Sequence, residues 1–171
     1  MNDDRKTSGN GAKKVEGEEE FERLIFFKTG AEWFALRVDE IREVVQRTQV
    51  TRIPNAPAVI LGIMNLRGKV LTIFDLDSTL GLPAARGKER LQVIILNLPD
   101  PEVDLGFLVD QVAQIRELST EQIREISPSA LGKKKGLFFR GALYYDAMVV
   151  NIINPFPIIS SLVPELEEAS G

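Results

Sequence analysis

Two polar residues, Asn65 and Arg67, interrupt the most hydrophobic part of the sequence, which extends from residue 55 to residue 76. Each can make several hydrogen bonds, and arginine keeps its charge, so a partly buried Arg67 needs a carboxylate or carbonyl partner. Glu43 is the carboxylate we single out, because it lies off the apolar line of its own segment. A Glu43–Arg67 bridge would join two separate elements. The alternative, two unconnected surface charges, stays open because sequence alone does not place the residues within reach of one another.

Residue types that commonly carry catalysis are missing from the sequence or poorly placed in it. The chain has no histidine and no cysteine, which removes Ser-His-Asp hydrolysis, histidine-ligated metals, phosphohistidine, disulfides and thiol chemistry. Asp75 and Asp77 lie two residues apart and could bind a cation or act as acid and base. We interpret Asp75 instead as a hydrogen-bond acceptor at a strand end and Asp77 as the cap of the next turn. We therefore expect no enzyme, no cofactor and no metal site.

The charge pattern argues against nucleic acid and membrane partners. The formal net charge is -4, so the chain as a whole does not attract polyanions or an anionic membrane surface. Lys133–Lys135 lie close to Phe138 and Phe139, a combination that can bind single-stranded nucleic acid, but we interpret the lysines as a solvated loop. No apolar run approaches the ~20 residues that span a bilayer, and the N-terminus has no apolar signal segment. We expect a cytoplasmic protein that does not insert into a membrane.

The elements that would position Asn65 and Arg67 are two strands. The apolar runs 59–64 and 70–74 are separated by a short break containing Gly68, which predicts a β-hairpin with glycine supplying a positive φ angle. Upstream, residues 21–28 and 33–38 predict a first hairpin turning at Gly30. Asp39 precedes Ile41, Val44 and Val45, a spacing of three to four that predicts a short helix carrying Glu43. Residues 49–53 predict a further short strand.

Downstream of residue 76, the pattern predicts mostly short strands. We expect a helical turn over 77–81, strands over 91–98, 103–109 and 111–118, and a capped turn over 119–123. We then expect a final hairpin of 136–140 with 142–150 and a C-terminal helix over 158–168. Nine or ten short strands indicate a mainly β fold, and a polar segment at 83–90 suggests the seam between two lobes. We divide the chain into a flexible tail at 1–20, one domain at 21–163 and a C-terminal tail at 164–171.

The central block resembles the CheW-like domains of chemotaxis adaptors. The similarity is carried by Gly62 to Gly68 (GIMNLRG) with Asp75-Leu76, by Val50 to Pro57 (VTRIPNAP), by Ile41 to Val44 (IREV), and by Phe107 to Val112 (FLVDQV). It implies a fold of two five-stranded SH3-like β-barrel lobes, with a few short helices, around a shared hydrophobic groove. It also implies a non-enzymatic scaffold that couples the cytoplasmic tip of chemoreceptors to the regulatory domain of a CheA-type histidine kinase.

The resemblance also implies which residues face partners. The Glu43 and Arg67 positions would form a bridge shaping the receptor-facing surface, and the full set of expected partner-binding positions is Ile41, Glu43, Val44, Thr51, Gly62, Asn65, Arg67 and Gly68. The chain departs from the pattern at Asp77, where arginine is common, and at Asn151, where an acidic residue is frequent. An adaptor in a paralogous pathway such as twitching or gliding motility is an alternative, and a small β-barrel nucleic-acid-binding protein is a more distant one.

Overall fold

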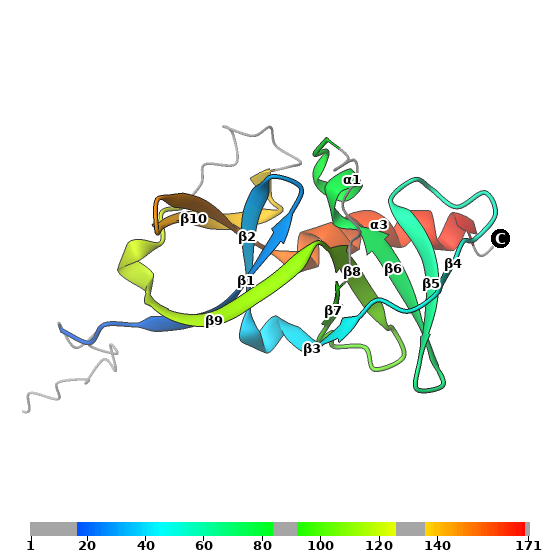
Figure 1. Ribbon diagram of the computed structural model, residues 1–171, viewed down its shortest axis with the longest axis horizontal. Helices are drawn as coiled ribbons and strands as arrows, with labels where there is room; N and C mark the ends of the chain where they lie inside the picture. The colour runs from blue at the N-terminus through cyan, green and yellow to red at the C-terminus, as the bar shows by residue number, and fades with distance from the viewer. Residues whose placement is uncertain (1–16, 84–91, 126–135, 170–171) are drawn as a thin grey trace, which may run out of the picture.

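The computed structural model describes residues 17–83, 92–125 and 136–169, with side chains described up to residue 162. Within these ranges, eleven strands form two sheets (Figure 1). The first sheet, which we call lobe 1, has the order β10-β11-β2-β1-β9. Its strands are β1 (Phe21–Thr29), β2 (Glu32–Arg37), β9 (Gln111–Ser119), β10 (Phe139–Tyr145) and β11 (Met148–Ile153).

The second sheet, which we call lobe 2, has the order β3-β7-β8-β6-β5-β4. Its strands are β3 (Ile41–Gln46), β4 (Val50–Thr51), β5 (Ile60–Leu66), β6 (Lys69–Asp75), β7 (Gln92–Leu96) and β8 (Leu105–Val109). The prediction of a mainly β fold with two lobes is confirmed. The sheet of lobe 1 has the expected five strands, whereas that of lobe 2 has six. Closure of each lobe into a barrel stays a prediction, although an isolated bridge between Arg124 and Ala142 links the segment after β9 to β10, the opposite edge strand of lobe 1.

The expected seam at residues 83–90 is wrong. Strands on both sides of that segment, β6 before it and β7 and β8 after it, belong to lobe 2, and β6 pairs in parallel with β8. Lobe 1 is instead built from the two ends of the domain, because β2 pairs in parallel with β11. Polar composition marks a loop, but it does not reveal which strands pair across it. The chain therefore passes from lobe 1 to lobe 2 after β2 and returns to lobe 1 after β8.

The helix expected at 39–45 is also wrong, because β3 is a strand. It pairs antiparallel with β7, and the register shifts between Ile41 and Glu43, leaving Arg42 as the extra residue of a β-bulge. The bulge puts Ile41 and Val44 against the same core cluster while Val45 packs against another. An apolar spacing of three can thus arise from a bulged strand as well as from a helix. Only a short 3-10 turn, η1 (Val38–Glu40), precedes the strand.

The final hairpin turns at a different place from the one expected. Tyr145 pairs with Met148, so the two-residue loop is Asp146-Ala147, and both have positive φ angles of 46° and 62°. Gly141, where the turn was expected, lies within β10 at a shift of register. A Cβ atom there would lie 2.6 Å from the Arg124 carbonyl oxygen. Gly141 is therefore needed because β10 lies very close to the segment at Arg124, and the chain does not reverse direction there.

The short helical elements follow local capping rules. Helix α1 (Leu76–Leu80) ends at Gly81 in the left-handed conformation, and η2 (Thr120–Gln122) has a capping box between Ser119 and Gln122, both as predicted. The expected cap role of Asp77 is wrong, since Asp75 is the N-cap residue of α1. Asp77 is instead buried and accepts a hydrogen bond from Thr29 Oγ1 of lobe 1 at 2.5 Å.

The C-terminal helix α3 (Pro155–Ala169) starts earlier than the predicted residue 158. Proline is favoured in the first turn of a helix, where its missing N–H has no intrahelical partner. The helix runs across the boundary expected at residues 163 and 164, and that division of the chain stays a prediction. None of the helices in the described ranges has the length and apolar character needed to span a bilayer.

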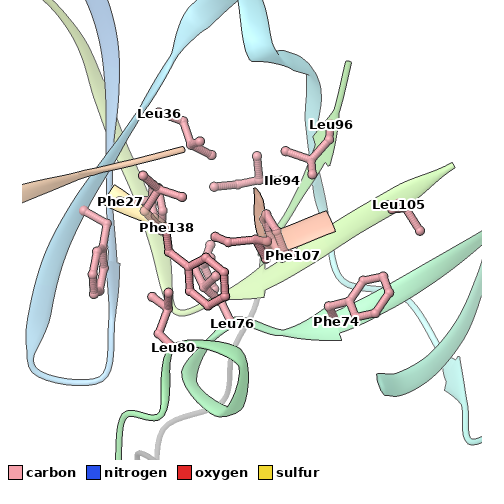
Figure 2. Close-up of a cluster of buried hydrophobic side chains, with 14 of the residues drawn as sticks. Phe27, Leu36, Phe74, Leu76, Leu80, Ile94, Leu96, Leu105, Phe107 and Phe138 are labelled. Atoms are coloured by element: carbon pink, nitrogen blue, oxygen red, sulfur yellow. The ribbon is translucent and has the colours of Figure 1, made fainter. Parts of the chain in front are cut away.

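Clusters of buried apolar side chains hold the fold together. One lies within lobe 1 and includes Leu24, Phe26 and Val150, and another lies within lobe 2 and includes Met64 and Leu71. The largest combines both lobes with α1 and α3, and Figure 2 shows its labelled members, Phe27, Leu36, Phe74, Leu76, Leu80, Ile94, Leu96, Leu105, Phe107 and Phe138, converging between the strands. Helix α3 passes behind β8 and β6 in Figure 1 and contributes Ile158 and Leu162 to this shared cluster. The lobes are thus joined by a contact of buried apolar side chains.

Candidate partner-binding surface

The β5–β6 hairpin presents Arg67 at its tip. Leu66 pairs with Lys69, so Arg67 and Gly68 form a two-residue loop, with φ angles of 51° and 82°. Two consecutive positive φ angles define a type I′ turn, whose twist matches that of the strands. Asn65 Oδ1 accepts a hydrogen bond from the Gly68 N–H at 3.1 Å. The predicted hairpin and its glycine are confirmed, and Asn65 stabilises the turn that displays Arg67.

Glu43 and Arg67 form an ion pair, which confirms the predicted bridge over the alternative of two separate surface charges. Arg67 Nη2 contacts Glu43 Oε2. Glu43 lies on β3, at one end of the strand order of lobe 2, while Arg67 lies next to β5, whose outer neighbour β4 is the other end. The Arg67 side chain is 68% exposed and that of Glu43 is 32% exposed. Such an exposed pair adds little stability, about 0–1 kcal/mol, and its structural effect is a contact between the hairpin tip and β3.

A shallow cavity of about 250 Å³ lies beside this ion pair. It is lined by Arg42, Glu43, Leu66, Arg67, Lys69 and Leu71. Three of these side chains are cationic, two are apolar and one is anionic, and Arg42 also contacts Asp104. The arrangement suits a partner surface that carries both an acidic and an apolar side chain. Sequence reasoning missed Arg42, Leu66 and Lys69, because a β-bulge and a type I′ turn, neither visible as a motif, bring them together.

Gly62 and Thr51 approach each other closely where β4 pairs with β5. A Cβ atom on Gly62 would lie 2.1 Å from the Thr51 carbonyl oxygen, and the φ angle of Gly62 is +147°. Only glycine fits this approach without moving the backbone. Thr51 itself is exposed, and Val50 and Thr51 pair with Met64 and Ile63 of β5. These two expected site residues therefore lie together on the β4 edge of lobe 2.

Ile41 and Val44 are not on the face that carries Glu43. Both are half-buried and pack against the cluster shared by the two lobes. Their partly exposed surface belongs to the junction between the lobes, whereas Glu43 is directed to the hairpin tip. The structure thus brings together Glu43, Asn65, Arg67 and Gly68 at the hairpin tip and Thr51 with Gly62 at the edge, and it places Ile41 and Val44 apart from both groups. Their roles in binding stay predictions.

The acidic pair and the aromatic residues that the sequence offered as alternative sites take part in the packing and hydrogen bonding of the fold. Asp75 accepts a hydrogen bond from Ser78 Oγ at 2.8 Å, and within the described residues no group of three acidic side chains is placed to hold a metal ion. Phe138 is buried in the shared cluster and Phe139 stacks on Phe34, so neither ring is presented for stacking with a base. The Lys133–Lys135 run lies outside the described residues.

Three comparisons relate this chain to known proteins. The family model for the CheW-like domain matches residues 23–163. The chemotaxis protein CheW of Rhizobium meliloti is 33% identical over 148 residues, which cover 86% of this chain and 91% of that protein. The crystal structure of the scaffolding protein TtCheW from Thermoanaerobacter tengcongensis superposes with a TM-score of 0.69 at 26% identity, covering 82% of this chain and 88% of the other. A more distant relative, the protein PilI of Pseudomonas aeruginosa, is 27% identical over 61% of this chain and 57% of its own.

Proposed function

We propose, because this chain belongs to the CheW-like domain family, that it is a non-enzymatic adaptor that couples chemoreceptors to a CheA-type histidine kinase in chemotaxis. Its partners are the cytoplasmic tip of a chemoreceptor and the regulatory domain of the kinase, and it works in the cytoplasm. The observation that carries the proposal is the Glu43–Arg67 ion pair, which holds a cationic head at the exposed tip of the β5–β6 hairpin. Of the expected partner positions, Glu43, Asn65 and Gly68 lie at that tip, Thr51 and Gly62 at the β4 edge, and Ile41 and Val44 at the lobe junction.

The adaptor acts through binding geometry. The chain presents the hairpin tip with its cavity, the β4 edge with the exposed Thr51 above the buried Gly62, and the lobe junction with Ile41 and Val44 as separate areas. A protein with separate binding areas can hold receptor and kinase at once and so raises their effective concentration for each other. A change of receptor conformation then alters kinase activity wherever the contacts differ between the two receptor states.

The Arg67→Glu variant tests this function. It places two carboxylates side by side at the hairpin tip and reverses the charge of the cavity wall, so we expect affinity for a chemoreceptor tip fragment to fall at least about tenfold. We expect binding of the kinase regulatory domain to change by less than about twofold, since a single rim charge outside an interface has little effect on affinity. Both affinities are measured by calorimetry on the full chain, with assembly of the three-protein complex followed by size-exclusion chromatography.

Arg124→Glu is the matched control, because Arg124 is an exposed arginine on the lobe 1 side, and the same charge change there should leave receptor binding intact. Unchanged circular dichroism and melting of Arg67→Glu show that the fold is kept. Equal loss of receptor and kinase binding, or equal effects of the two arginine variants, would contradict the assigned role of the hairpin tip.

The similarity to PilI supports a second candidate function, that of the same kind of adaptor in a paralogous motility pathway such as twitching or gliding. The two functions share a mechanism and differ in the receptor and kinase that are bound. Affinity capture with the full chain from its own cells, followed by identification of the bound kinase, separates them.

A further inference from the structure

A buried carboxylate lies where the chain crosses from lobe 1 to lobe 2. Glu40 ends the short turn η1, which connects β2 of lobe 1 to β3 of lobe 2, and its side chain is only 7% exposed. A carboxylate so removed from water requires compensating charges and hydrogen-bond donors. The family resemblance did not single out this residue, and sequence reasoning treated the turn only as part of a helix.

Both lobes hold this crossing point. On the lobe 1 side, Arg140 Nη2 of β10 forms an ion pair with Glu40 Oε1, and the Arg37 backbone N–H donates to Glu40 Oε2 at 3.2 Å. On the lobe 2 side, the Asn97 backbone N–H donates to the Glu40 carbonyl oxygen at 2.9 Å, and Asn97 Nδ2 donates to the Asp39 carbonyl oxygen at 3.0 Å. Because Asn97 directly follows β7, the contacts of Glu40 extend from β10 of lobe 1 to the end of β7 in lobe 2.

Arg140 depends on the Glu40 carboxylate to neutralise its largely buried charge. Its side chain is 22% exposed, and its Nη1 atom is buried with no hydrogen-bond partner in the described part of the chain. Nη2 also donates to Asn154 Oδ1, but at 3.4 Å. Loss of the Glu40 charge would leave a largely buried guanidinium with one long hydrogen bond to a neutral amide, which is costly in a protein interior. The pair also lines a cavity of about 370 Å³ beside Phe156, which gives the junction room to open.

We infer that Glu40 and Arg140 are positioning residues for the partner surface: they fix β3 relative to lobe 1 and thereby set the place of Ile41 and Glu43. Glu40 directly precedes Ile41, and the β-bulge follows at once, so any movement of η1 is passed to the start of β3. This inference rests on the proposed function only for its effect on binding, since the structural coupling exists without a partner. It assigns a role in binding to Arg140, although β10 belongs to the other sheet from the hairpin tip.

Amide hydrogen exchange by NMR on the full chain tests the coupling without any partner. In Glu40→Gln and in Arg140→Gln, we expect the amides of Asn97 and of Val44 and Val45 in β3 to exchange at least about tenfold faster, because local opening of the junction becomes easier. Amides in the cores of the separate lobes, Phe26 and Leu71, should keep their rates. The double variant should be no faster than either single variant, since the two residues act as one unit.

Glu117→Gln is the control, because Glu117 is an exposed carboxylate of β9, the edge strand of lobe 1 opposite β10. The same carboxylate-to-amide change there should leave the Asn97 and β3 amides unaffected. If Glu40→Gln does not fold, Arg140→Lys keeps a positive charge at the junction and should give a smaller acceleration at the same amides. Acceleration shared equally by Phe26 and Leu71, additive effects in the double variant, or no change at Asn97 would each overturn the inference.

A second measurement separates this inference from the proposed function. Affinity of each variant for a chemoreceptor tip fragment is compared with that of Arg67→Glu. We expect about a threefold to tenfold loss for Glu40→Gln, smaller than the loss for Arg67→Glu, because it moves the surface without removing a contact. Faster exchange at β3 with unchanged affinity would refute the positioning role while leaving the adaptor function intact. Failure of the unmodified chain to bind the fragment would refute the proposed function and leave the structural coupling to be judged by exchange alone.

Discussion

At the scale of single residues, the partner surface depends on positions where backbone geometry restricts the side chain. Gly62 lies against the Thr51 carbonyl oxygen, and Arg67 adopts a positive φ angle of 51° at the hairpin tip. An L-residue with a side chain adopts this conformation at a cost of roughly 1–2 kcal/mol. Arginine bears that cost at residue 67, where its charge pairs with Glu43. One of these positions displays a charge, and the other admits a close approach of two chain segments.

Gly62→Ala tests the close approach. The added Cβ would lie 2.1 Å from a backbone oxygen, and the φ angle of +147° is unfavourable for alanine. We expect a loss of about 3 kcal/mol or more in the free energy of unfolding, measured by urea denaturation. Gly68→Ala is the control: its φ angle is +82° but no atom lies within 4 Å of the added Cβ, so its loss should stay near about 1 kcal/mol. Equal losses in the two variants would show that backbone strain alone explains the glycine at residue 62.

At the scale of elements, two hairpins use the same turn geometry with different residues. The β5–β6 hairpin turns at Arg67-Gly68 and the β10–β11 hairpin at Asp146-Ala147, each with two positive φ angles. Glycine in the second turn position relieves strain, and alanine does not. The β10–β11 turn therefore carries local strain that neighbouring contacts must offset. One of these contacts is the edge-to-face packing of Tyr145 on Phe26, at 5.2 Å between ring centres.

Ala147→Gly should stabilise the protein. The native φ angle of 62° is accessible to glycine without strain, so removal of the side chain is expected to raise the free energy of unfolding by about 0.5–1 kcal/mol. Thermal and urea unfolding of the full chain measure the change. Ala31→Gly, at an exposed alanine outside the residues with positive φ, should lower stability or leave it unchanged. A loss of stability in Ala147→Gly would show that the turn is not strained.

At the scale of the whole molecule, we expect the two lobes to unfold as one unit. The shared cluster takes Phe27, Phe34 and Leu36 from lobe 1 and Phe74 and Phe107 from lobe 2, all buried. Polar contacts also cross the junction, between Thr29 and Asp77 and around Glu40. If either lobe loses side chains from the shared cluster, both lobes lose packing contacts. The chain also connects the lobes covalently, because it passes from lobe 1 to lobe 2 after β2 and back to lobe 1 after β8.

Phe107→Ala tests this coupling. Phe107 belongs to β8 of lobe 2, and its truncation should cost about 3–5 kcal/mol. The single tryptophan, Trp33, lies in β2 of lobe 1 and packs on the lobe 1 cluster. We expect its fluorescence transition in urea to shift to lower concentration together with that of the circular dichroism signal. A tryptophan transition that keeps its midpoint while the circular dichroism midpoint falls would show that the lobes unfold independently.

Local chemistry determined what the sequence alone could reveal about this protein. Alternating apolar runs and the Arg67-Gly68 break predicted the β5–β6 hairpin, Gly81 ended a helical turn, and Ser119 with Gln122 formed a capping box. Each of these depends on residues within a few positions of one another. The surrounding motif was specific enough to indicate the family with its two lobes, and the pattern of nine or ten short strands indicated the mainly β class.

Only the tertiary structure decided the features that depend on long-range pairing. The bulge at Arg42 changed the apolar spacing of β3 from two to three and so imitated a helix, and Gly141 served a contact with Arg124 instead of a turn. Lobe 1 joins the two ends of the domain, which no local signal encodes. The Glu43–Arg67 pair was a hypothesis from sequence, whereas Glu40–Arg140 was not foreseen. In each case, the outcome was set by strand register between distant segments, because register decides which side chains come within reach of one another.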